Sequence, residues 1–273
     1  MVKVIDGNKL AEQKEAKLKK KVEVLRLKGR VFKLVGLVMK DDEAGLLYSR
    51  LKAEAAERVG IEFEKRVMVE LEADKIVGLI EKFNQDDRVQ GIMVQRPGVK
   101  WGKQQGMSRE EFEAWWERIV GVIDLKKDVD GLRQDSGFIM ATVKAVAGVL
   151  ELAGVTKAKV VVVGSRGLIG RRLIKYLGDK GFEVKGVDVD EADLGRVTRE
   201  AEVVVSATGQ AGLIKEGMIK SGTVVIDVGW PKGDVEFETV KEKAAVITPV
   251  PGGIGPLTVV SLLENLLEVG YII

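Results

Sequence analysis

The residues most suggestive of chemistry are a tyrosine and a lysine four positions apart. Residues 44–59 have the apolar spacing and the closing glycine that predict a helix, so Tyr48 and Lys52 would share one of its faces. Such a pair supplies a hydroxyl beside an amine, and the amine can transfer protons if its surroundings lower its pKa. The alternative is a surface lysine packed on a tyrosine ring.

The sequence contains no cysteine and no histidine. Their absence excludes disulfides, thiolate nucleophiles, cysteine-bound or histidine-bound metals, and a Ser-His-Asp triad. Acid–base chemistry near neutral pH therefore needs a lysine, carboxyl group or tyrosine with a shifted pKa. Lowering the pKa of a lysine from about 10.4 to about 7.5 costs roughly 4 kcal/mol, which burial and a nearby cation can supply.

Two further groups of polar residues stand at predicted turns. Gln95 ends a predicted strand at 89–95, just before Pro97, so its amide lies at the carboxyl edge of a sheet, where open α/β sheets bind ligands. The alternative is an ordinary amide at a strand end. Asp128 and Asp130 form an i, i+2 pair that could bind a guanidine-like ring edge, hold a divalent metal or cap the turn. No further acidic cluster is nearby, so we expect no metal.

A glycine-rich turn follows the β-branched run 159–163. Gly164, Gly167 and Gly170 would let the backbone approach a pyrophosphate at the start of the next helix. Asp188 ends the next predicted strand, where an acid can bind a ribose diol. Two later strands end in the glycine-containing segments 206–209 and 227–229, which suits a crevice at a sheet edge. The alternative is that these glycines only serve tight turns.

The string TPVPGGIGPLT at 248–258 holds three of the five prolines in the chain. A loop so constrained suggests close backbone contact with a ligand, although a rigid linker to the last helix is the alternative.

These motifs need two sheets of parallel strands, each covered by helices. Strand and helix patterns alternate twice along the chain, with a boundary between about residues 132 and 142. The sequence therefore predicts the α/β class. The predicted strands are 33–39, 63–71, 89–95, 159–163, 182–190, 201–209, 222–229 and 244–253. The predicted helices are 9–28, 44–59, 73–83, 110–120, 142–152, 171–179 and 256–267, and 99–106 is predicted to be a loop.

Length and charge agree with an ordinary globular protein. The 273 residues suit one large domain or two smaller ones, and 44 basic against 42 acidic residues give a net charge of +2. A balance so close to neutral predicts no nucleic-acid or membrane partner. We find no signal-peptide core and no apolar run long enough to span a membrane, and we expect a cytoplasmic protein.

Taken together, the motifs resemble the bifunctional methylenetetrahydrofolate dehydrogenase/methenyltetrahydrofolate cyclohydrolase family. They occur in the order of the family and cover most of the chain, and PGGIGPLT and KDVDG are the specific ones. The matching strings are VIDGNKLA at 4–11, Tyr48-x-x-x-Lys52, GIMVQRP at 91–97, KDVDGL at 127–132, VVVGSRGLIGR at 161–171, VVIDVG at 224–229 and TPVPGGIGPLT at 248–258.

The resemblance implies two α/β domains with a folate cleft between them. Residues 1–136 would form the folate-binding catalytic domain, with the helix 256–273 packed back on it, and 137–255 a Rossmann-like dinucleotide-binding domain. The implied activities are oxidation of 5,10-methylenetetrahydrofolate with NAD or NADP and hydrolysis of the methenyl product to 10-formyltetrahydrofolate. The family also suggests a cytoplasmic homodimer whose partner is a small folate molecule.

The resemblance also assigns roles to individual residues. Lys52 would be the key residue of hydrolysis, Tyr48 would stack near the pterin, Gln95 would tune the lysine, and Asp130 would hold the amino-pyrimidine edge. Implied folate-binding residues are Asp128, Pro97, Pro251, Gly252, Gly253, Gly255 and Pro256. Implied cofactor-binding residues are Gly164, Ser165, Arg166, Gly170, Asp188, Thr208, Gly209, Gly229, Trp230 and Thr258.

The chain also departs from the family pattern. The P-x-T-P-x-G string between the domains is lost except for Thr142, Arg96 replaces a leucine, and Ser165 stands where arginine is frequent. Asp188 would repel a 2′-phosphate, which favours NAD slightly, although Arg166 and Lys185 could compensate. Two other functions stay open: a dehydrogenase for a carboxylic or amino acid, and a folate or nucleotide binder without catalysis.

Overall fold

The computed structural model describes residues 2–69 and 71–272, which divide into two compact units. Unit 1 comprises 1–12 and 142–258, and unit 2 comprises 13–141 and 259–273. The division passes within the first and the last long helix. The sequence places a boundary near residue 136, whereas the first residues of the chain cluster with unit 1 because they add a strand to its sheet.

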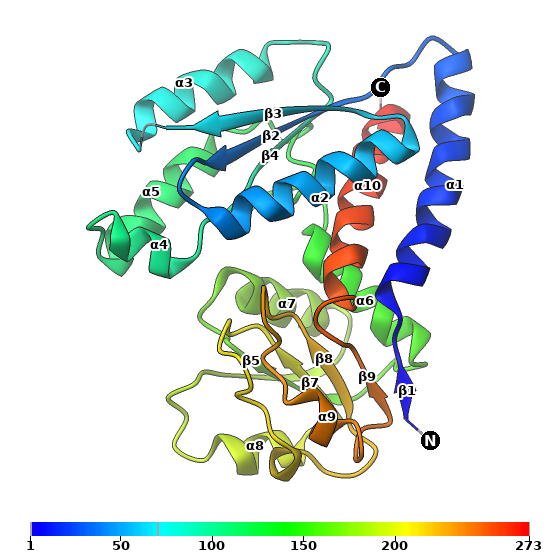
Figure 1. The fold of residues 1–273 in the computed structure, drawn as a ribbon, viewed down its shortest axis with the longest axis vertical. Coiled ribbons are helices and arrows are strands. Elements are labelled where there is room, and N and C mark those ends of the chain that lie inside the picture. The colour runs from blue at the N-terminus through cyan, green and yellow to red at the C-terminus, as the bar shows by residue number, and fades with distance from the viewer. Residues whose placement is uncertain (1, 70, 273) are drawn as a thin grey trace. The chain divides into compact units, whose positions relative to one another are not determined.

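Unit 1 is built on a six-stranded sheet in the order β1-β9-β8-β7-β5-β6, and every neighbouring pair is parallel (Figure 1). Its strands are β1 (Lys3–Val4), β5 (Lys159–Val163), β6 (Glu183–Val187), β7 (Val203–Ser206), β8 (Val224–Asp227) and β9 (Val246–Ile247). Its helices are α6 (Ala141–Leu152), α7 (Leu168–Asp179), α8 (Leu194–Glu200), the 3₁₀ turn η1 (Glu216–Met218) and α9 (Phe237–Val240).

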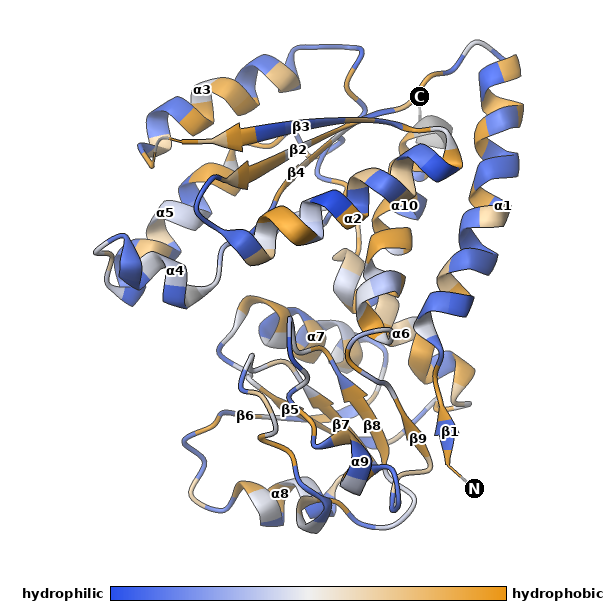
Figure 2. Cartoon of the chain, in the orientation of Figure 1, coloured by the Kyte–Doolittle hydropathy of each residue, from blue (hydrophilic) through white to orange (hydrophobic). Residues whose placement is uncertain are grey.

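The core of unit 1 follows from runs of β-branched residues. Strands β5, β7 and β8 read KVVVV, VVVS and VVID, and they are buried almost throughout. A parallel strand covered on both faces needs apolar side chains at successive positions, which explains runs rather than alternation. The edge strand β6, EVKGV, is mostly exposed and carries charges. Figure 2 shows the same contrast as orange central strands in this sheet.

Unit 2 holds a three-stranded parallel sheet in the order β3-β2-β4. The central strand, buried from Leu34 onward, pairs Leu34 with Phe63 on one side and with Gly91 on the other. The elements are α1 (Gly7–Leu27), β2 (Lys33–Met39), α2 (Glu43–Val59), β3 (Glu62–Met68), α3 (Ala73–Asn84), β4 (Gly91–Val94), α4 (Val99–Gln104), α5 (Arg109–Gly121) and α10 (Ile254–Ile272), with α1 and α10 shared with unit 1.

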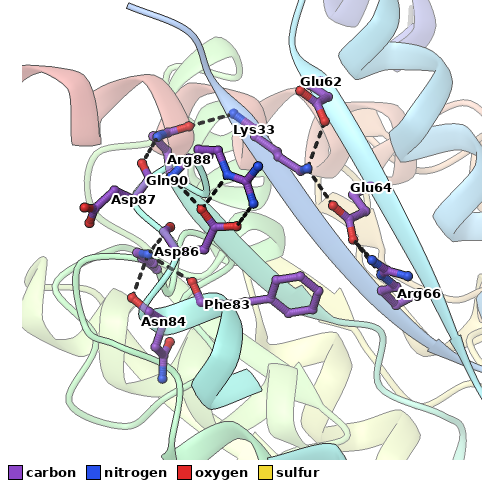
Figure 3. A network of polar contacts seen from close by, with 11 residues as sticks. Lys33, Glu62, Glu64, Arg66, Phe83, Asn84, Asp86, Asp87, Arg88 and Gln90 are labelled. Carbon is purple, nitrogen blue, oxygen red and sulfur yellow. Dashed lines mark hydrogen bonds and ion pairs between the residues drawn. The ribbon is translucent and has the colours of Figure 1, made fainter. Parts of the chain in front are cut away.

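The exposed edge of this smaller sheet is held by charges. The ammonium of Lys33 lies 2.9 Å from Glu62 and 2.6 Å from Glu64, and the backbone N–H of Lys33 donates to the side chain of Gln90 (Figure 3). Charged side chains along an edge strand discourage pairing with another chain.

The predicted alternation of strands and helices is confirmed, and so is the α/β class with two parallel sheets. The prediction of a loop at 99–106 is wrong, because 99–104 form α4, on which Gly102 packs closely against Phe112. Helix α7 begins at Leu168, three residues before the predicted start, and α10 is longer than predicted at both ends. Among the helices the structure describes, none is long and apolar enough to cross a membrane.

Candidate active site

The first part of the site lies on α2. Its buried residues include Gly45, Ser49, Lys52 and Ala56, so Lys52 falls within the stripe that faces the protein interior. The spacing of three and four residues makes that stripe one helical face. Lys52 is only 3% exposed, and its ammonium lies 5.0 Å from the ring centroid of Tyr48, one turn earlier. The predicted sharing of one face is confirmed.

The structure brings two other predicted residues to the same ammonium. Nζ of Lys52 donates to Oε1 of Gln95 and to Oδ2 of Asp130, each at 3.3 Å. Asp130 is 7% exposed, so the ion pair is largely shielded from water. Three separate segments, α2, the end of β4 and the turn after residue 127, thus converge on one lysine.

The turn that carries Asp130 is tied to its surroundings at several points. The N–H of Ile92 in β4 donates to the carbonyl of Lys127 at 2.8 Å. The side chain of Asn265 in α10, 1% exposed, donates to the carbonyls of Val129 and Ile139 at 2.8 and 2.9 Å. The sequence analysis missed Asn265, because nothing in a lone asparagine of an apolar helix reveals its acceptors. These bonds hold Asp130 within reach of Lys52.

Asp128 has a different role in the same turn. It is fully buried, and its two oxygens accept from the N–H groups of Leu132 and Arg133 at 2.9 and 3.0 Å. Burial raises the pKa of Asp128, and those two N–H groups oppose the rise. The geometry favours the turn-capping alternative over contact with a ligand. Pro97, which follows the end of β4, is also buried.

The glycine turn of unit 1 has the geometry that a dinucleotide site needs. Gly164, at φ +93°, ends β5 in a conformation that disfavours other residues, and a Cβ on it would lie 2.5 Å from the carbonyl oxygen of Ala207. A Cβ on Gly170 would lie 2.1 Å from the carbonyl oxygen of Gly164. The close turn leads directly into α7, whose first N–H groups have no acceptor within the helix and suit an anion.

An acidic residue lies beside that turn, at the end of β6. The hydroxyl of Ser165 donates to Asp188, and Nε of Arg166 lies 3.1 Å from the same carboxylate. A second guanidinium nitrogen of Arg166 lies 2.6 Å from Asp190. The predicted residues Ser165, Arg166 and Asp188 therefore form one cluster, with Asp190 added by the structure.

Two buried acids hold the loops that follow β7 and β8. Oδ2 of Asp234 accepts from the N–H and the hydroxyl of Thr208 at 2.7 and 2.9 Å. Asp227 accepts from the N–H of Gly229 at 2.8 Å, and from those of Asp234 and Val235. Burial raises the pKa of Asp227 to about 6, against the effect of these N–H groups. The sequence analysis selected Thr208, Gly209, Gly229 and Trp230 but missed both acids.

The proline–glycine loop belongs to unit 1. Gly252 has φ +95°, and its carbonyl accepts from the N–H of Gly7 at 2.7 Å. Gly253 is buried against Pro249, and the hydroxyl of Thr258 donates to the carbonyl of Ile254 in the first turn of α10. The other predicted residues of this loop are Pro251, which is exposed, and Gly255 and Pro256, which are half-buried.

The residues of unit 1 fit a bound dinucleotide. A tight glycine turn after the first strand, a helix beginning there, and an acid at the end of the second strand are the parts that such a group requires. In the described ranges, 2–69 and 71–272, no group of three or more acidic side chains is arranged to hold a metal ion.

Comparisons with known proteins match nearly all of the chain. A family model described as tetrahydrofolate dehydrogenase/cyclohydrolase, catalytic domain, matches residues 5–130, and the corresponding NAD(P)-binding domain matches 140–271. A curated relative, the bifunctional protein FolD of Exiguobacterium sp., is 36% identical over 286 aligned residues, which cover 98% of this chain and 99% of the relative.

Solved structures agree with this match. The bifunctional enzyme FolD, methylenetetrahydrofolate dehydrogenase/cyclohydrolase, from Campylobacter jejuni superposes with a TM-score of 0.88 at 29% identity, covering 100% of this chain and 99% of the other. The methylenetetrahydrofolate dehydrogenase-cyclohydrolase of Trypanosoma brucei, complexed with NADP and an inhibitor, gives 0.86 at 29% identity, covering 99% and 98%.

Proposed function

The chain belongs to the tetrahydrofolate dehydrogenase/cyclohydrolase family, and from that premise we propose that Lys52 is the residue on which its hydrolytic reaction depends. The protein is a bifunctional enzyme that oxidises 5,10-methylenetetrahydrofolate with NAD(P) and hydrolyses the methenyl product to 10-formyltetrahydrofolate. One observation supports the proposal above all: a lysine 3% exposed, held between Gln95 and Asp130.

The oxidation does not require a side chain that transfers a proton. The one-carbon unit lies between two nitrogen atoms, which stabilise the cation left when a hydride departs. When bound, NAD(P) supplies the acceptor for that hydride. The contribution of the protein is then to align the two molecules and exclude water. We assign the holding of the dinucleotide to Gly164, Ser165, Gly170 and the first turn of α7, with contacts from Thr208, Gly209, Gly229, Trp230 and Thr258.

The hydrolysis does need a proton to move. Water adds to the methenyl carbon and releases one proton. The remaining hydroxyl then loses its proton and becomes the formyl oxygen as the bond from that carbon to N5 breaks and N5 gains a proton. With no histidine or cysteine in the sequence, Lys52 is the group we assign to this transfer. Gln95 and Asp130 keep its ammonium in place, and the ring of Tyr48 lies beside it.

The folate would be held by residues around this lysine. We assign the amino-pyrimidine edge to Asp130, whose second oxygen is not used by Lys52. We assign further contacts with the folate to Gly252, Gly253 and Pro256. Asp128 is left out, because backbone N–H groups already bind both of its oxygens.

The decisive experiment measures both activities in Lys52→Met and Lys52→Ala. Reduced cofactor and methenyl absorbance are followed with methylenetetrahydrofolate, and hydrolysis is followed separately with methenyltetrahydrofolate. We expect hydrolysis to disappear while oxidation continues. Unchanged hydrolysis in either variant would refute the role of Lys52. Binding of folate without turnover by the natural protein would support a non-catalytic binder instead.

We further propose that NAD is preferred over NADP. The cation beside the end of β6, Arg166, already faces two carboxylates, Asp188 and Asp190. A 2′-phosphate would have to displace one of them and would be repelled by the other. We expect a higher kcat/KM with NAD, and a reduced preference in Asp188→Asn. A strong preference of the natural protein for NADP would overturn this proposal, with Lys185 then a candidate for the compensating cation.

We also propose that the enzyme is a cytoplasmic homodimer. The family resemblance suggests both, the small net charge of +2 permits association, and the absence of cysteine is compatible with a reducing compartment. Light scattering coupled to size exclusion should give twice the 29.8 kDa of one chain. A monomer at micromolar concentration would contradict the dimer.

A further inference from the structure

A buried carboxylate in unit 1 links two loops that the proposed function assigns to the dinucleotide. Asp234 is fully buried and lies where the loop after β8 ends. Its Oδ2 accepts from the backbone N–H of Thr208 at 2.7 Å, and from the hydroxyls of Thr208 and Ser206 at 2.9 Å each. Ser206 ends β7, and Thr208 lies in the loop that follows it. Three donors on one buried acceptor fix that loop, because breaking them would leave the oxygen unsatisfied.

The loop after β7 lies directly beside the glycine turn. Strands β5 and β7 are neighbours, with Val163 opposite Ser206, so the turn and the loop leave the same edge of the sheet. A Cβ built on Gly164 would lie 2.5 Å from the carbonyl oxygen of Ala207 and 3.3 Å from the methyl carbon of Thr208. The position of Thr208 therefore determines how closely this loop approaches the turn.

The backbone around Asp234 is held independently of its side chain. The N–H of Asp234 donates to Oδ1 of Asp227 at 3.1 Å, and the N–H of Val235 donates to Oδ2 of the same acid at 2.9 Å. The carbonyl of Asp234 accepts from the N–H of Ile214 at 2.9 Å. These bonds fix the point from which the side chain of Asp234 reaches Thr208.

The two carboxylate oxygens of Asp234 are used unequally. Within residues 2–69 and 71–272, no hydrogen-bond donor reaches Oδ1. That oxygen lies against Gly229 instead, since a Cβ built on this glycine would lie 2.6 Å from it and 2.9 Å from Oδ1 of Asp227. The loop after β8 thus leaves room for the carboxylate because residue 229 has no side chain. Oδ2 alone carries the hydrogen bonds to the other loop.

We propose that Asp234 is a positioning residue for cofactor binding. It holds Thr208 beside the glycine turn and so arranges the loop that receives the dinucleotide. The inference rests on the proposed assignment of this loop and turn to the cofactor. It requires a hydrogen-bond acceptor at the place of Oδ2, and it does not require the negative charge.

Two substitutions test this requirement. Asp234→Ala removes the acceptor, whereas Asp234→Asn keeps one oxygen for Thr208 and places its NH₂ group in the space beside Gly229, which Asp227 also borders. We expect KM for NAD in the oxidation to rise about tenfold in Asp234→Ala and about twofold in Asp234→Asn, with kcat within about twofold in both. Hydrolysis of added methenyltetrahydrofolate consumes no NAD, so it should stay within about twofold.

The split between the two activities identifies the positioning role. A general structural role predicts that Asp234→Ala lowers hydrolysis together with oxidation, and that result would overturn the inference. Equal rises in KM in the two variants would overturn it as well, because the charge would then be what matters. If Asp234→Ala does not fold, Asp234→Ser replaces it with the same expectation, since its hydroxyl is too short to reach Thr208.

The matched control removes another hydrogen-bonded aspartate of unit 1. Asp193 caps α8 by accepting from the N–H of Arg196 at 2.9 Å. Asp193→Ala should lower thermal stability without changing KM for NAD. A rise in KM as large as that of Asp234→Ala would mean that any loss of stability in this unit weakens the cofactor site, and the inference would fail.

Gly164→Ala separates this inference from the assignment on which it rests. The added Cβ would displace the loop at Ala207, so we expect KM for NAD to rise about tenfold or more. If Gly164→Ala raises KM but no Asp234 variant does, the inference fails and the assignment stands. If neither Gly164→Ala nor Asp234→Ala changes KM for NAD, the assignment of the cofactor to this turn fails first.

Discussion

Two lysines of unit 2, the buried Lys52 and the half-buried Lys127, are held in opposite ways. The ammonium of Lys127 donates to three backbone carbonyls, those of Phe83, Asn84 and Asp86, at 3.0, 2.8 and 2.9 Å. These acceptors are labelled in Figure 3 at the end of α3. The ammonium of Lys52 instead lies 3.3 Å from each of two side-chain oxygens.

The partners explain the difference in use. Backbone carbonyls at the end of a helix neither titrate nor turn, so they bind a cation permanently and complete the helix end. Burial lowers the pKa of Lys127, while Asp124, Asp87 and Asp86 oppose that effect. Side-chain partners at longer distances can turn away or exchange a proton when substrate arrives. We infer that Lys127 is structural and that Lys52 is reactive.

The same contrast separates two acids of one motif. Both carboxylate oxygens of Asp128 accept hydrogen bonds from backbone N–H groups, whereas Asp130, two residues later, accepts one from Lys52. In the segment 127–130, Lys127 and Asp128 are therefore structural, and Asp130 is the partner of the reactive lysine. Both acids are buried, so what distinguishes them is the kind of partner: backbone N–H groups for Asp128 and a side-chain ammonium for Asp130.

The largest effect should come from exchanging the reactive ammonium for another cation. Lys52→Arg keeps the positive charge, but a guanidinium does not lose a proton in proteins. We expect hydrolysis to fall by about 10²- to 10⁴-fold, the usual contribution of a proton-transfer group. Oxidation should change far less. Hydrolysis at the natural rate in Lys52→Arg would mean that only the positive charge is needed. Lys52 would then not be distinguished from Lys127 as a proton-transfer group.

The next effect concerns a carboxylate held by backbone, as Lys127 is. Because the pKa of Asp227 is raised from 3.8 to about 6, its folded form binds a proton that its unfolded form has lost at intermediate pH. Its contribution to stability is therefore complete below about pH 4 and is lost as the pH rises through about 6. The loss amounts to about 3 kcal/mol.

Asparagine, which does not titrate, isolates this contribution. The difference in unfolding free energy between Asp227→Asn and the natural protein should move in favour of the variant by about 2.5 kcal/mol from pH 4 to pH 7. Denaturant unfolding at several pH values measures it. A difference that stays constant with pH would show that Asp227 is ionised throughout this range in the folded protein.

Removing the structural ammonium should reduce stability and spare activity. Lys127→Met leaves three carbonyls at the end of α3 without their donor, and we expect a loss of about 2 kcal/mol in the free energy of unfolding. kcat for hydrolysis should stay within about twofold at a temperature where the variant is folded. Lys126→Met, at an exposed neighbour, is the control. If a stably folded Lys127→Met variant lost hydrolysis, Lys127 would contribute to the reaction as well as to stability.

Much of the architecture could be predicted because local sequence patterns determine many of the strands and helices. A continuous run such as 159–163 indicates a strand buried on both faces, and the structure confirms it. Strand β1 could not be predicted, since its two residues form a strand only by pairing with Val246 and Ile247. Helix α4 was missed because its composition is polar and glycine-containing, and its packing on Phe112 is visible only in three dimensions.

The site divides in the same way. The spacing of Tyr48 and Lys52 predicts a shared helical face, and a polar residue at the end of a strand, such as Gln95, indicates a ligand edge. The burial of single acids is not a local property. Asp227 and Asp234 look like ordinary turn residues until the tertiary fold places loops around them.

The smallest effect should come from a charge that is held by side chains but lies outside the proposed chemistry. Arg96 follows Gln95, and its guanidinium lies 2.6 Å from Glu113 and 5.0 Å from the ring centroids of Phe112 and Trp116. These contacts attach the end of β4 to α5. Arg96→Leu, which restores the residue of the family pattern, should cost about 1 kcal/mol of unfolding free energy.

Hydrolysis should remain within about threefold in Arg96→Leu, because the ion pair and ring contacts of Arg96 lie on α5, whereas the ammonium of Lys52 is held by Gln95 and Asp130. A double-mutant cycle with Glu113→Gln would assign the stability loss to the ion pair. A large loss of hydrolysis would mean that the side-chain partners of Lys52, Gln95 and Asp130, do not by themselves explain its reactivity. In that case the position of Gln95 would depend on the contacts between the end of β4 and α5. The reactivity of Lys52 would then depend on those contacts as well as on its own two partners.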